Sequence, residues 1–302
     1  MATEYLGIDI GGTNVKMGIV EAETGNITNF YSHDTASWRK SGHFVKRLGD
    51  AIAIQLKENP QVEKCGIGVP GLITRDRLSL IEITAIPEID GISVIPELSE
   101  RFPGKSFFLE NDANAAALGE YYFGEEGVPE DYIFVTLGTG VGGAAIIDKK
   151  VFKGGGGNAM EPGHMPSKHG RVLERNIGKV ELLDLANGMR AEWNGETTLV
   201  DDGSISTTGL VAAAADGDEL ALAIFDEVGT ILGDGLVSMV RILDITTILI
   251  GGGLSASFDY IMPAVERQID YWLTPYYKNS MDIKRATLGN DAGLLGAASL
   301  CF

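Results

Sequence analysis

The apolar positions along the chain fall into short alternating or continuous runs, separated by glycine-rich or polar turns. Residues 5–10, 15–21 and 26–32 are three such runs, joined by GGTN and AETG, and they predict a meander of three strands. From 43 to 56 the apolar residues recur at helical spacing, which predicts a helix. ENPQ ends that run, and a further strand is expected at 62–69.

The rest of the chain alternates in a similar way. SFFLE at 106–110 predicts a strand, and the alanine-rich run after it favours a helix with Asn111 or Asp112 at the capping position. A long amphipathic helix is expected at 219–241. The apolar run ITTILI follows and predicts a buried strand that ends in three glycines. A strand followed by glycines and a helix suits nucleotide binding.

The strand, glycine turn, strand pattern of the N-terminus occurs a second time. DYIFVTLGTGVGGAAIID repeats it 126 residues later, counting from Asp9 to Val135. Two similar halves of this kind predict two related α/β lobes that face a central cleft. The polar, turn-rich residues 194–209 are expected to form a loop or surface excursion rather than a linker between independent domains.

Composition and charge narrow the class of protein. The 302 residues are 44% apolar, enough for a substantial core. No run reaches the roughly 20 apolar residues of a membrane span, and no leader pattern opens the chain, so a cytoplasmic protein is expected. The net charge of −18, without a Lys/Arg cluster, argues against nucleic-acid or membrane partners. Cys65 and Cys301 lie in apolar surroundings, which predicts buried free thiols.

Two glycine turns are candidates for phosphate binding. GTGVGG at 138–143 matches G-x-G-x-x-G, but an apolar strand follows it where a dinucleotide site needs a helix. One glycine hairpin tip would by itself be simply a turn. Here two tips each place glycine beside threonine, at Gly12-Thr13 and at Gly138-Thr139-Gly140. Bare backbone and a hydroxyl group together can hold a phosphate.

Several motifs in a fixed order carry a family resemblance. DIGGT at 9–13, LGTGVGG at 137–143 and GGG at 251–253 resemble the phosphate and adenosine motifs of the sugar kinase, hexokinase and actin superfamily. ENDANAAALGE and EPGHM make the chain similar to the ROK family (repressor, open reading frame, kinase), which includes glucokinases and amino-sugar kinases. The resemblance implies two ribonuclease-H-like, actin-like lobes with a cleft between them. The small N-terminal lobe would comprise residues 1–112 plus 288–302, and the large lobe residues 113–287.

The resemblance also implies a role for each motif residue. Asp9 would orient the Mg²⁺ shell through water. The implied contacts to ATP are Gly11, Gly12 and Thr13 at the transferring phosphate, Gly138, Thr139 and Gly140 at the other phosphates, and Gly252 and Gly253 at adenosine. The implied sugar contacts are Gly71, Asn111, Asp112, Glu161, His164 and Glu174, with Asp112 as the catalytic residue.

Asp112 suits catalysis on chemical grounds as well. A sugar hydroxyl that attacks the γ-phosphoryl group must lose a proton, which a nearby carboxylate can accept. The simpler interpretation is a helix N-cap, and the two roles are compatible. Asp112→Asn separates them, because asparagine caps a helix about as well as aspartate but is no base.

Glu161 and His164 could be surface residues of a glycine-rich loop, or a pair that binds vicinal hydroxyls. The chain departs from the family directly after them. HMPSKHGRVLERNIG replaces the cysteine-rich segment that holds a structural zinc in many members, so no zinc is expected here. The altered loop leaves open where Glu174 lies and which sugar is selected. Asn14 stands where the family often has lysine, and Lys16 lies on the same side of the strand.

The sequence therefore predicts an ATP-dependent hexose kinase that closes over a sugar and Mg-ATP. Glucokinase is expected first, with N-acetylmannosamine, N-acetylglucosamine or fructose kinase as alternatives. A second candidate is a non-catalytic sugar sensor, which has no need of a base such as Asp112. DNA binding of the family's repressor type is not expected, since the first glycine motif begins by residue 9. An actin-like or chaperone-like ATPase is disfavoured by ENDANAAALGE and EPGHM. The resemblance suggests a homodimer.

Overall fold

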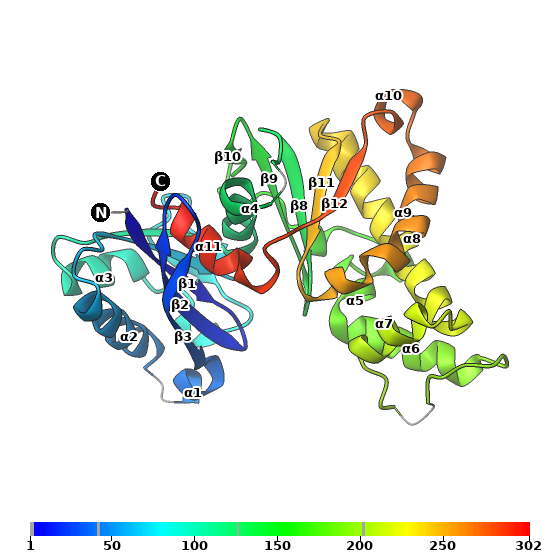
Figure 1. Cartoon of the computed structure of the whole chain (residues 1–302), viewed down its shortest axis with the longest axis horizontal. Coiled ribbons are helices and arrows are strands. Elements are labelled where there is room, and N and C mark those ends of the chain that lie inside the picture. Colours follow the sequence, from blue (N-terminus) through cyan, green and yellow to red (C-terminus); the bar gives the residue numbers. More distant parts are fainter. Residues whose placement is uncertain (1–2, 41–42, 126, 201–202) are drawn as a thin grey trace. The chain divides into compact units, whose positions relative to one another are not determined.

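The computed structural model describes residues 3–40, 43–125, 127–200 and 203–302. The chain divides into two compact units (Figure 1). Unit 1 comprises Met1–Glu130, Ala144–Ala159 and Thr287–Phe302, and unit 2 comprises Asp131–Gly143 and Met160–Ala286. None of the helices in the described ranges combines the length and the apolar character that crossing a membrane requires.

Unit 1 is built on a five-stranded sheet. Its order is β3 (Ile27–Asp34), β2 (Asn14–Glu21), β1 (Glu4–Ile10), β4 (Lys64–Val69) and β7 (Ser106–Asn111). The first three strands form the predicted antiparallel meander, and β4 and β7 run parallel to β1. The helices of this unit are α1 (Thr35–Lys40), α2 (Phe44–Glu58), α3 (Val94–Arg101), α4 (Asp112–Phe123) and α11 (Ala292–Ser299).

The alternation along β1 decides what each face of this sheet contacts. Leu6 and Ile8 point into the core that is shared with Leu48 and Ile52 of α2. The residues between them, such as Gly7, face the opposite way. A short ribbon of β5 (Leu72–Ile73) and β6 (Leu80–Glu82) also belongs to this unit.

Glycines bring the C-terminal helix onto the sheet. A Cβ atom on Gly7 would lie against the carbonyl of Leu294, and one on Gly66 against the carbonyl of Ala297. Figure 1 shows α11 beside β1, at the other end of the colour scale. Because α11 packs directly on backbone, substitution of these strand glycines is sterically excluded.

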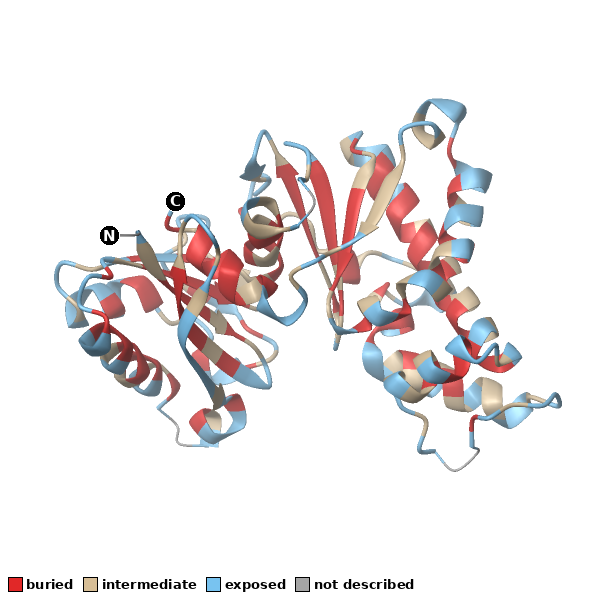
Figure 2. Cartoon of the chain, in the orientation of Figure 1, coloured by how far each residue is buried: buried red, intermediate tan, exposed pale blue. Residues whose placement is uncertain are grey.

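The second sheet repeats the topology of the first. Its order is β10 (Lys150–Val151), β9 (Val141–Ile147), β8 (Tyr132–Leu137), β11 (Thr247–Gly251) and β12 (Asp282–Arg285). Counted in chain order, both sheets have the sequence third, second, first, fourth, fifth, and in both the first and fourth strands are parallel. The predicted internal repeat is confirmed. Figure 2 shows buried residues along the central strands of each sheet.

Unit 2 also contains helices. They are α5 (Glu174–Ile177), α6 (Lys179–Glu192), α7 (Thr207–Ala215), α8 (Glu219–Leu243), α9 (Phe258–Trp272) and α10 (Pro275–Lys278). Gly229 and Gly233 let α8 pack closely on α9, because a Cβ at either position would collide with that helix. Short 3₁₀ helices lie at Pro87–Ile89, Pro162–His164, Lys168–Gly170, Gly253–Ser257 and Gly289–Asp291.

The structure refines several predicted bounds. The long helix α8 ends at Leu243, where the left-handed Asp244 stops it. The loop expected at 194–209 is shorter, because Ser206 caps α7, which starts at Thr207; residues 201 and 202 lie outside the described ranges. The division into units also differs from the expected lobes, since α4 belongs to unit 1. The reason is close packing of α4 on α11, where a Cβ on Gly296 would overlap the carbonyl of Ala115.

Both cysteines are buried and free, as predicted. Burial raises the pKa of the Cys65 thiol to about 12 and raises that of Cys301 as well. Neither thiol is therefore a nucleophile at neutral pH.

Candidate active site

The first glycine turn connects β1 to β2. The amide of Gly11 donates to the carbonyl of Asn14 (2.9 Å). Buried Thr35 anchors the turn from α1, with its hydroxyl on the Gly11 carbonyl (2.7 Å) and its amide on the Thr13 carbonyl (2.9 Å). The tip, from Gly12 to Asn14, is exposed. Because the Gly11 amide already has a partner in the turn, the donors that the tip offers to a phosphate are the amides of Gly12 and Thr13 and the Thr13 hydroxyl.

Asp9 lies at the end of β1, directly before this turn. Strand register pairs it with Lys16, whose Nζ lies 4.0 Å from Asp9 Oδ2 and donates to the Asn290 carbonyl (2.8 Å). Burial raises the pKa of Asp9, and the charge of Lys16 opposes that rise. Lys16, two residues after Asn14 in β2, therefore places a positive charge beside Asp9.

The surroundings of Asp9 fit a hydrated Mg²⁺ ion. Mg²⁺ usually takes one or two carboxylates, keeps several waters and binds substrate phosphates. Asp9 is a partly buried carboxylate, 18% exposed, beside the exposed tip of the first glycine turn. Within the described part of the chain, no group of three or more His, Cys, Asp or Glu residues could hold a metal ion by itself. The absence of a structural zinc stays a prediction.

The junction of β7 and α4 carries Asn111 and Asp112. Asn111 is the N-cap of α4, because its Oδ1 accepts from the amides of Ala113 (2.9 Å) and Asn114 (3.2 Å). Asp112 is the first helical residue, and its Oδ1 accepts from the Ala113 amide (2.8 Å). The structure thus assigns the N-cap to Asn111, and the bond to Ala113 orients the carboxylate of Asp112.

Gly71 lies beside this junction. The side-chain amide of Asn111 donates to the Gly71 carbonyl (3.2 Å), so the loop after β4 contacts the β7–α4 junction directly. Gly71 has a φ of 89°, and a Cβ there would collide with the carbonyl of Glu82. Only glycine fits this position without strain. Gly71 is therefore joined by a hydrogen bond to Asn111, the residue before Asp112, within unit 1.

Unit 2 contains the second glycine turn, between β8 and β9. The Gly138 amide donates to the Gly140 carbonyl (2.9 Å), and Thr139 at the tip is exposed. Glu174, the first residue of α5, accepts a hydrogen bond from the Val141 amide at Oε2 (3.0 Å). Its carboxylate also fills the space beside Gly140 that a Cβ would occupy. Glu174 is therefore an anchor of this turn, a contact that its place in the sequence did not indicate.

Glu161 and His164 lie on the neighbouring EPGH turn. Their side chains approach to 3.9 Å, between Glu161 Oε2 and His164 Nδ1, and His164 is the more exposed of the two. Burial raises the pKa of Glu161; His164 lowers it, and the charge of Glu174 raises it further. A Cβ on Gly163 would collide with the Val141 carbonyl, so the EPGH turn packs closely on β9. Glu161, His164 and Glu174 thus gather around the start of β9.

Gly252 and Gly253 follow β11. Gly252 has a φ of 86°, and a Cβ there would collide with the backbone of Leu137, the residue before Gly138. Gly253 opens the 3₁₀ helix that leads into α9, and a Cβ there would meet nothing within 4 Å. The carboxyl ends of the parallel strands β8 and β11 thus lie side by side, which is where α/β sheets bind ligands.

Each unit therefore assembles its own set of predicted residues. Unit 1 holds Asp9, Gly11, Gly12, Thr13, Gly71, Asn111 and Asp112, whereas unit 2 holds Gly138, Thr139, Gly140, Glu161, His164, Glu174, Gly252 and Gly253. Four residues that support this set were not identified from the sequence. Thr35 bonds the first glycine turn, Glu110 pairs with Arg77 and bonds the Asn111 amide, and Gly293 lies against Asp9. Glu110 is the first residue of ENDANAAALGE, but nothing in the spacing of that motif indicated its partners.

Comparison with known proteins gives consistent matches over the whole chain. The model of the ROK family matches residues 5–302. The glucokinase of Streptomyces coelicolor is 31% identical over 98% of this chain and 96% of its own. A solved structure from Cytophaga hutchinsonii is 41% identical with a TM-score of 0.94 and covers 99% of both chains. A ROK family glucokinase from Streptomyces griseus, solved with glucose and AMPPNP, is 28% identical with a TM-score of 0.78 over 98% of both chains. The expected α/β fold class is confirmed.

Proposed function

Because the chain belongs to the ROK family and is an ATP-dependent sugar kinase, we propose that glucose is its acceptor and that Asp112 is the general base of the transfer. The assignment of Asp112 as the base rests on the separate roles of Asn111 and Asp112 at the β7–α4 junction. Asn111 is the N-cap of α4, so Asp112 is not needed in that role, and the Ala113 amide orients its carboxylate. A carboxylate held in one orientation at a helix start suits proton abstraction.

The proposed reaction is an in-line transfer. The sugar hydroxyl oxygen forms a bond to the γ-phosphorus of ATP, the bond from that phosphorus to the β,γ-bridging oxygen breaks, and ADP leaves. The hydroxyl proton passes to the carboxylate of Asp112. Asn111 and Gly71 of unit 1 and Glu161, His164 and Glu174 of unit 2 are proposed to hold the other hydroxyls by directed hydrogen bonds.

The phosphates are assigned to the two glycine turns. The amides of Gly12 and Thr13 with the Thr13 hydroxyl are proposed to bind the transferring phosphate, and Gly138, Thr139 and Gly140 the others. Gly252 and Gly253 are proposed to lie against adenosine. Asp9 would hold Mg²⁺ through water, and the ion would neutralise phosphate charge when bound. Lys16 adds positive charge beside Asp9 in a chain of strongly negative net charge.

Glucose is proposed over other hexoses on the strength of the relatives. The two related kinases named above are glucokinases. A homodimer and a cytoplasmic location remain proposals that rest on the family. The competing function is a sugar sensor on the same fold, for which the orientation of Asp112 would have no use.

ADP release by the purified protein tests this proposal. The protein is assayed with Mg-ATP and, separately, glucose, fructose, mannose, N-acetylglucosamine and N-acetylmannosamine. We expect glucose to give the highest kcat/KM and ATP turnover without sugar to be far slower. A higher kcat/KM for an amino sugar would overturn the substrate assignment. Glucose binding without turnover would favour the sensor.

A further inference from the structure

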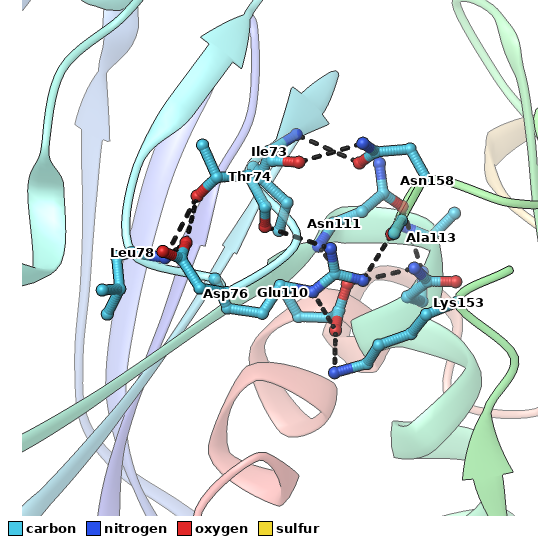
Figure 3. A network of polar contacts seen from close by, with 12 residues as sticks. Ile73, Thr74, Asp76, Leu78, Glu110, Asn111, Ala113, Lys153 and Asn158 are labelled. Carbon is cyan, nitrogen blue, oxygen red and sulfur yellow. Dashed lines mark hydrogen bonds and ion pairs between the residues drawn. The ribbon is translucent and has the colours of Figure 1, made fainter. Parts of the chain in front are cut away.

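Glu110 is a buried carboxylate directly before Asn111. Its side chain is 2% exposed and has four donor partners, of which Lys153 is labelled beside it in Figure 3. They are Arg77 Nε (3.0 Å), Lys153 Nζ (3.2 Å), the backbone amide of Asn111 (3.0 Å) and Asn114 Nδ2 (3.1 Å). A buried carboxylate with this number of donors is held in one place, because moving it would leave several polar groups without partners.

Arg77 connects this carboxylate to two other segments. Its side chain is 10% exposed, with Nη2 donating to the Gly157 carbonyl (2.6 Å) and Nη1 to the Thr74 carbonyl (3.4 Å). Its φ of 61° is a left-handed conformation that a non-glycine residue adopts only at some cost. The loop between β5 and β6 is therefore constrained to present this guanidinium to Glu110.

The glycine-rich segment 153–158 is tied to the same place. Lys153, at its start, pairs with Glu110, and Asn158, at its end, bonds both the amide (3.1 Å) and the carbonyl (2.9 Å) of Ile73. Gly157 has a φ of 100°, and a Cβ there would lie 3.0 Å from the backbone of Arg75. Both ends of the segment are thus fastened to the residues around Gly71 and Asn111.

We propose that Glu110 is a positioning residue for sugar binding. Through Arg77 and Lys153 it holds three segments together: the loop after Gly71, the β7–α4 junction with Asn111 and Asp112, and the segment 153–158 that leads in sequence to Glu161. The inference rests on the proposed function, since it assigns Glu110 to the same sugar site. A merely structural ion pair would affect folding stability and leave sugar kinetics unchanged.

Glu110→Gln tests the inference, because it keeps the shape of the side chain and removes the charge that Arg77 and Lys153 share. Glu120→Gln is the matched control. Glu120 lies on α4 itself, is 2% exposed and accepts bonds from Thr287 and Leu288 at the far end of that helix. Lys153→Met, at a side chain that is 45% exposed, is a milder variant in case Glu110→Gln folds poorly.

The expected result is a rise in the sugar KM of about 10- to 100-fold for Glu110→Gln, with the ATP KM within about twofold of the wild type. Arg77→Met is expected to raise the sugar KM as well. Arg77→Lys should raise it less, since lysine keeps the positive charge but lacks the planar guanidinium group. The control Glu120→Gln should lower the melting temperature without raising the sugar KM. An unchanged sugar KM in Glu110→Gln, or an equal rise in Glu120→Gln, would overturn the inference.

Amide hydrogen exchange separates this inference from the proposed function. If the wild type phosphorylates no sugar, the proposed function fails, but exchange can still be compared between the two variants without any ligand. Faster exchange at residues 73–79 and 154–158 in Glu110→Gln alone would support the positioning role. Unchanged exchange there, or equal acceleration in Glu120→Gln, would contradict it.

Discussion

The carboxylate of Asp9 lies against the backbone of Gly293, near the start of the C-terminal helix α11. A Cβ at position 293 would lie 2.7 Å from Asp9 Oδ2, a distance at which one of the two groups must move. The end of the chain therefore limits where the proposed Mg²⁺-orienting carboxylate can point. This contact also explains why a glycine begins the GLLGAA stretch at 293–298.

Gly293→Ala is expected to push the Asp9 carboxylate aside. If Asp9 orients Mg²⁺ as proposed, displacing it should lower kcat by about 10- to 100-fold and raise the Mg²⁺ concentration needed for half-maximal rate. Titration of activity with Mg²⁺ measures both effects. Gly188→Ala on α6 is the control, because its Cβ would meet nothing within 4 Å. Equal kinetics in the two variants would contradict the proposed role of Asp9 in orienting Mg²⁺.

The raised pKa of Glu161 predicts a pH dependence of sugar affinity. If the ionised form accepts hydrogen bonds from sugar hydroxyls, the sugar KM should rise as the pH falls through that pKa, earlier than for an ordinary glutamate. The pH profile of kcat/KM for glucose, compared with that of Glu161→Gln, measures this. A profile that is identical in the variant would mean that another group titrates.

The raised pKa of Glu161 also affects folding stability, but for stability the protonated form is the favourable one, whereas sugar affinity favours the ionised form. Because folding raises the pKa of Glu161, its protonated form favours the folded state, and this contribution is lost as the pH rises through the folded pKa. Glu161→Gln should therefore be at least as stable as the wild type at neutral pH, even though its sugar affinity falls. Urea denaturation at neutral and acidic pH checks the sign.

Gly252→Ala is expected to destabilise the protein by about 2–4 kcal/mol, because the new methyl group meets the Leu137 backbone at a positive φ. Gly253→Ala, whose methyl group would point into open space, should cost less than about 1 kcal/mol. Chemical denaturation of the two variants gives the comparison. Similar free energies of unfolding would contradict the close packing of β11 on β8.

Glu174 is expected to act on ATP binding through the second glycine turn. Glu174→Gln retains an oxygen for the Val141 amide, whereas Glu174→Ala leaves that amide without this acceptor. The ATP KM should rise about tenfold in Glu174→Ala and about twofold in Glu174→Gln. Should the glutamine variant lose as much as the alanine variant, the charge of Glu174 matters more than its bond to the turn.

Periodicity and glycine turns predicted the meander, the helices α2, α4 and α8, and the duplicated topology, because these depend on local patterns of burial. The contacts between segments far apart in sequence were not predictable in this way. Arg77, Glu110 and Lys153 each resemble an ordinary surface charge in the sequence, and only the sheet order and the β5–β6 loop bring them together. The unit boundary differs from the expected one for the same reason, since the packing of α4 on α11 joins residues from the middle and the end of the chain.

The central claim is tested most directly by Asp112→Asn. Phosphoryl transfer is measured in a single turnover with saturating glucose and Mg-ATP, and glucose affinity is measured separately by calorimetry. The account predicts a fall in the transfer rate of about 10²- to 10⁴-fold with a melting temperature near that of the wild type, because Asn111 still caps α4. A transfer rate within a few fold of the wild type would show that Asp112 is not the base.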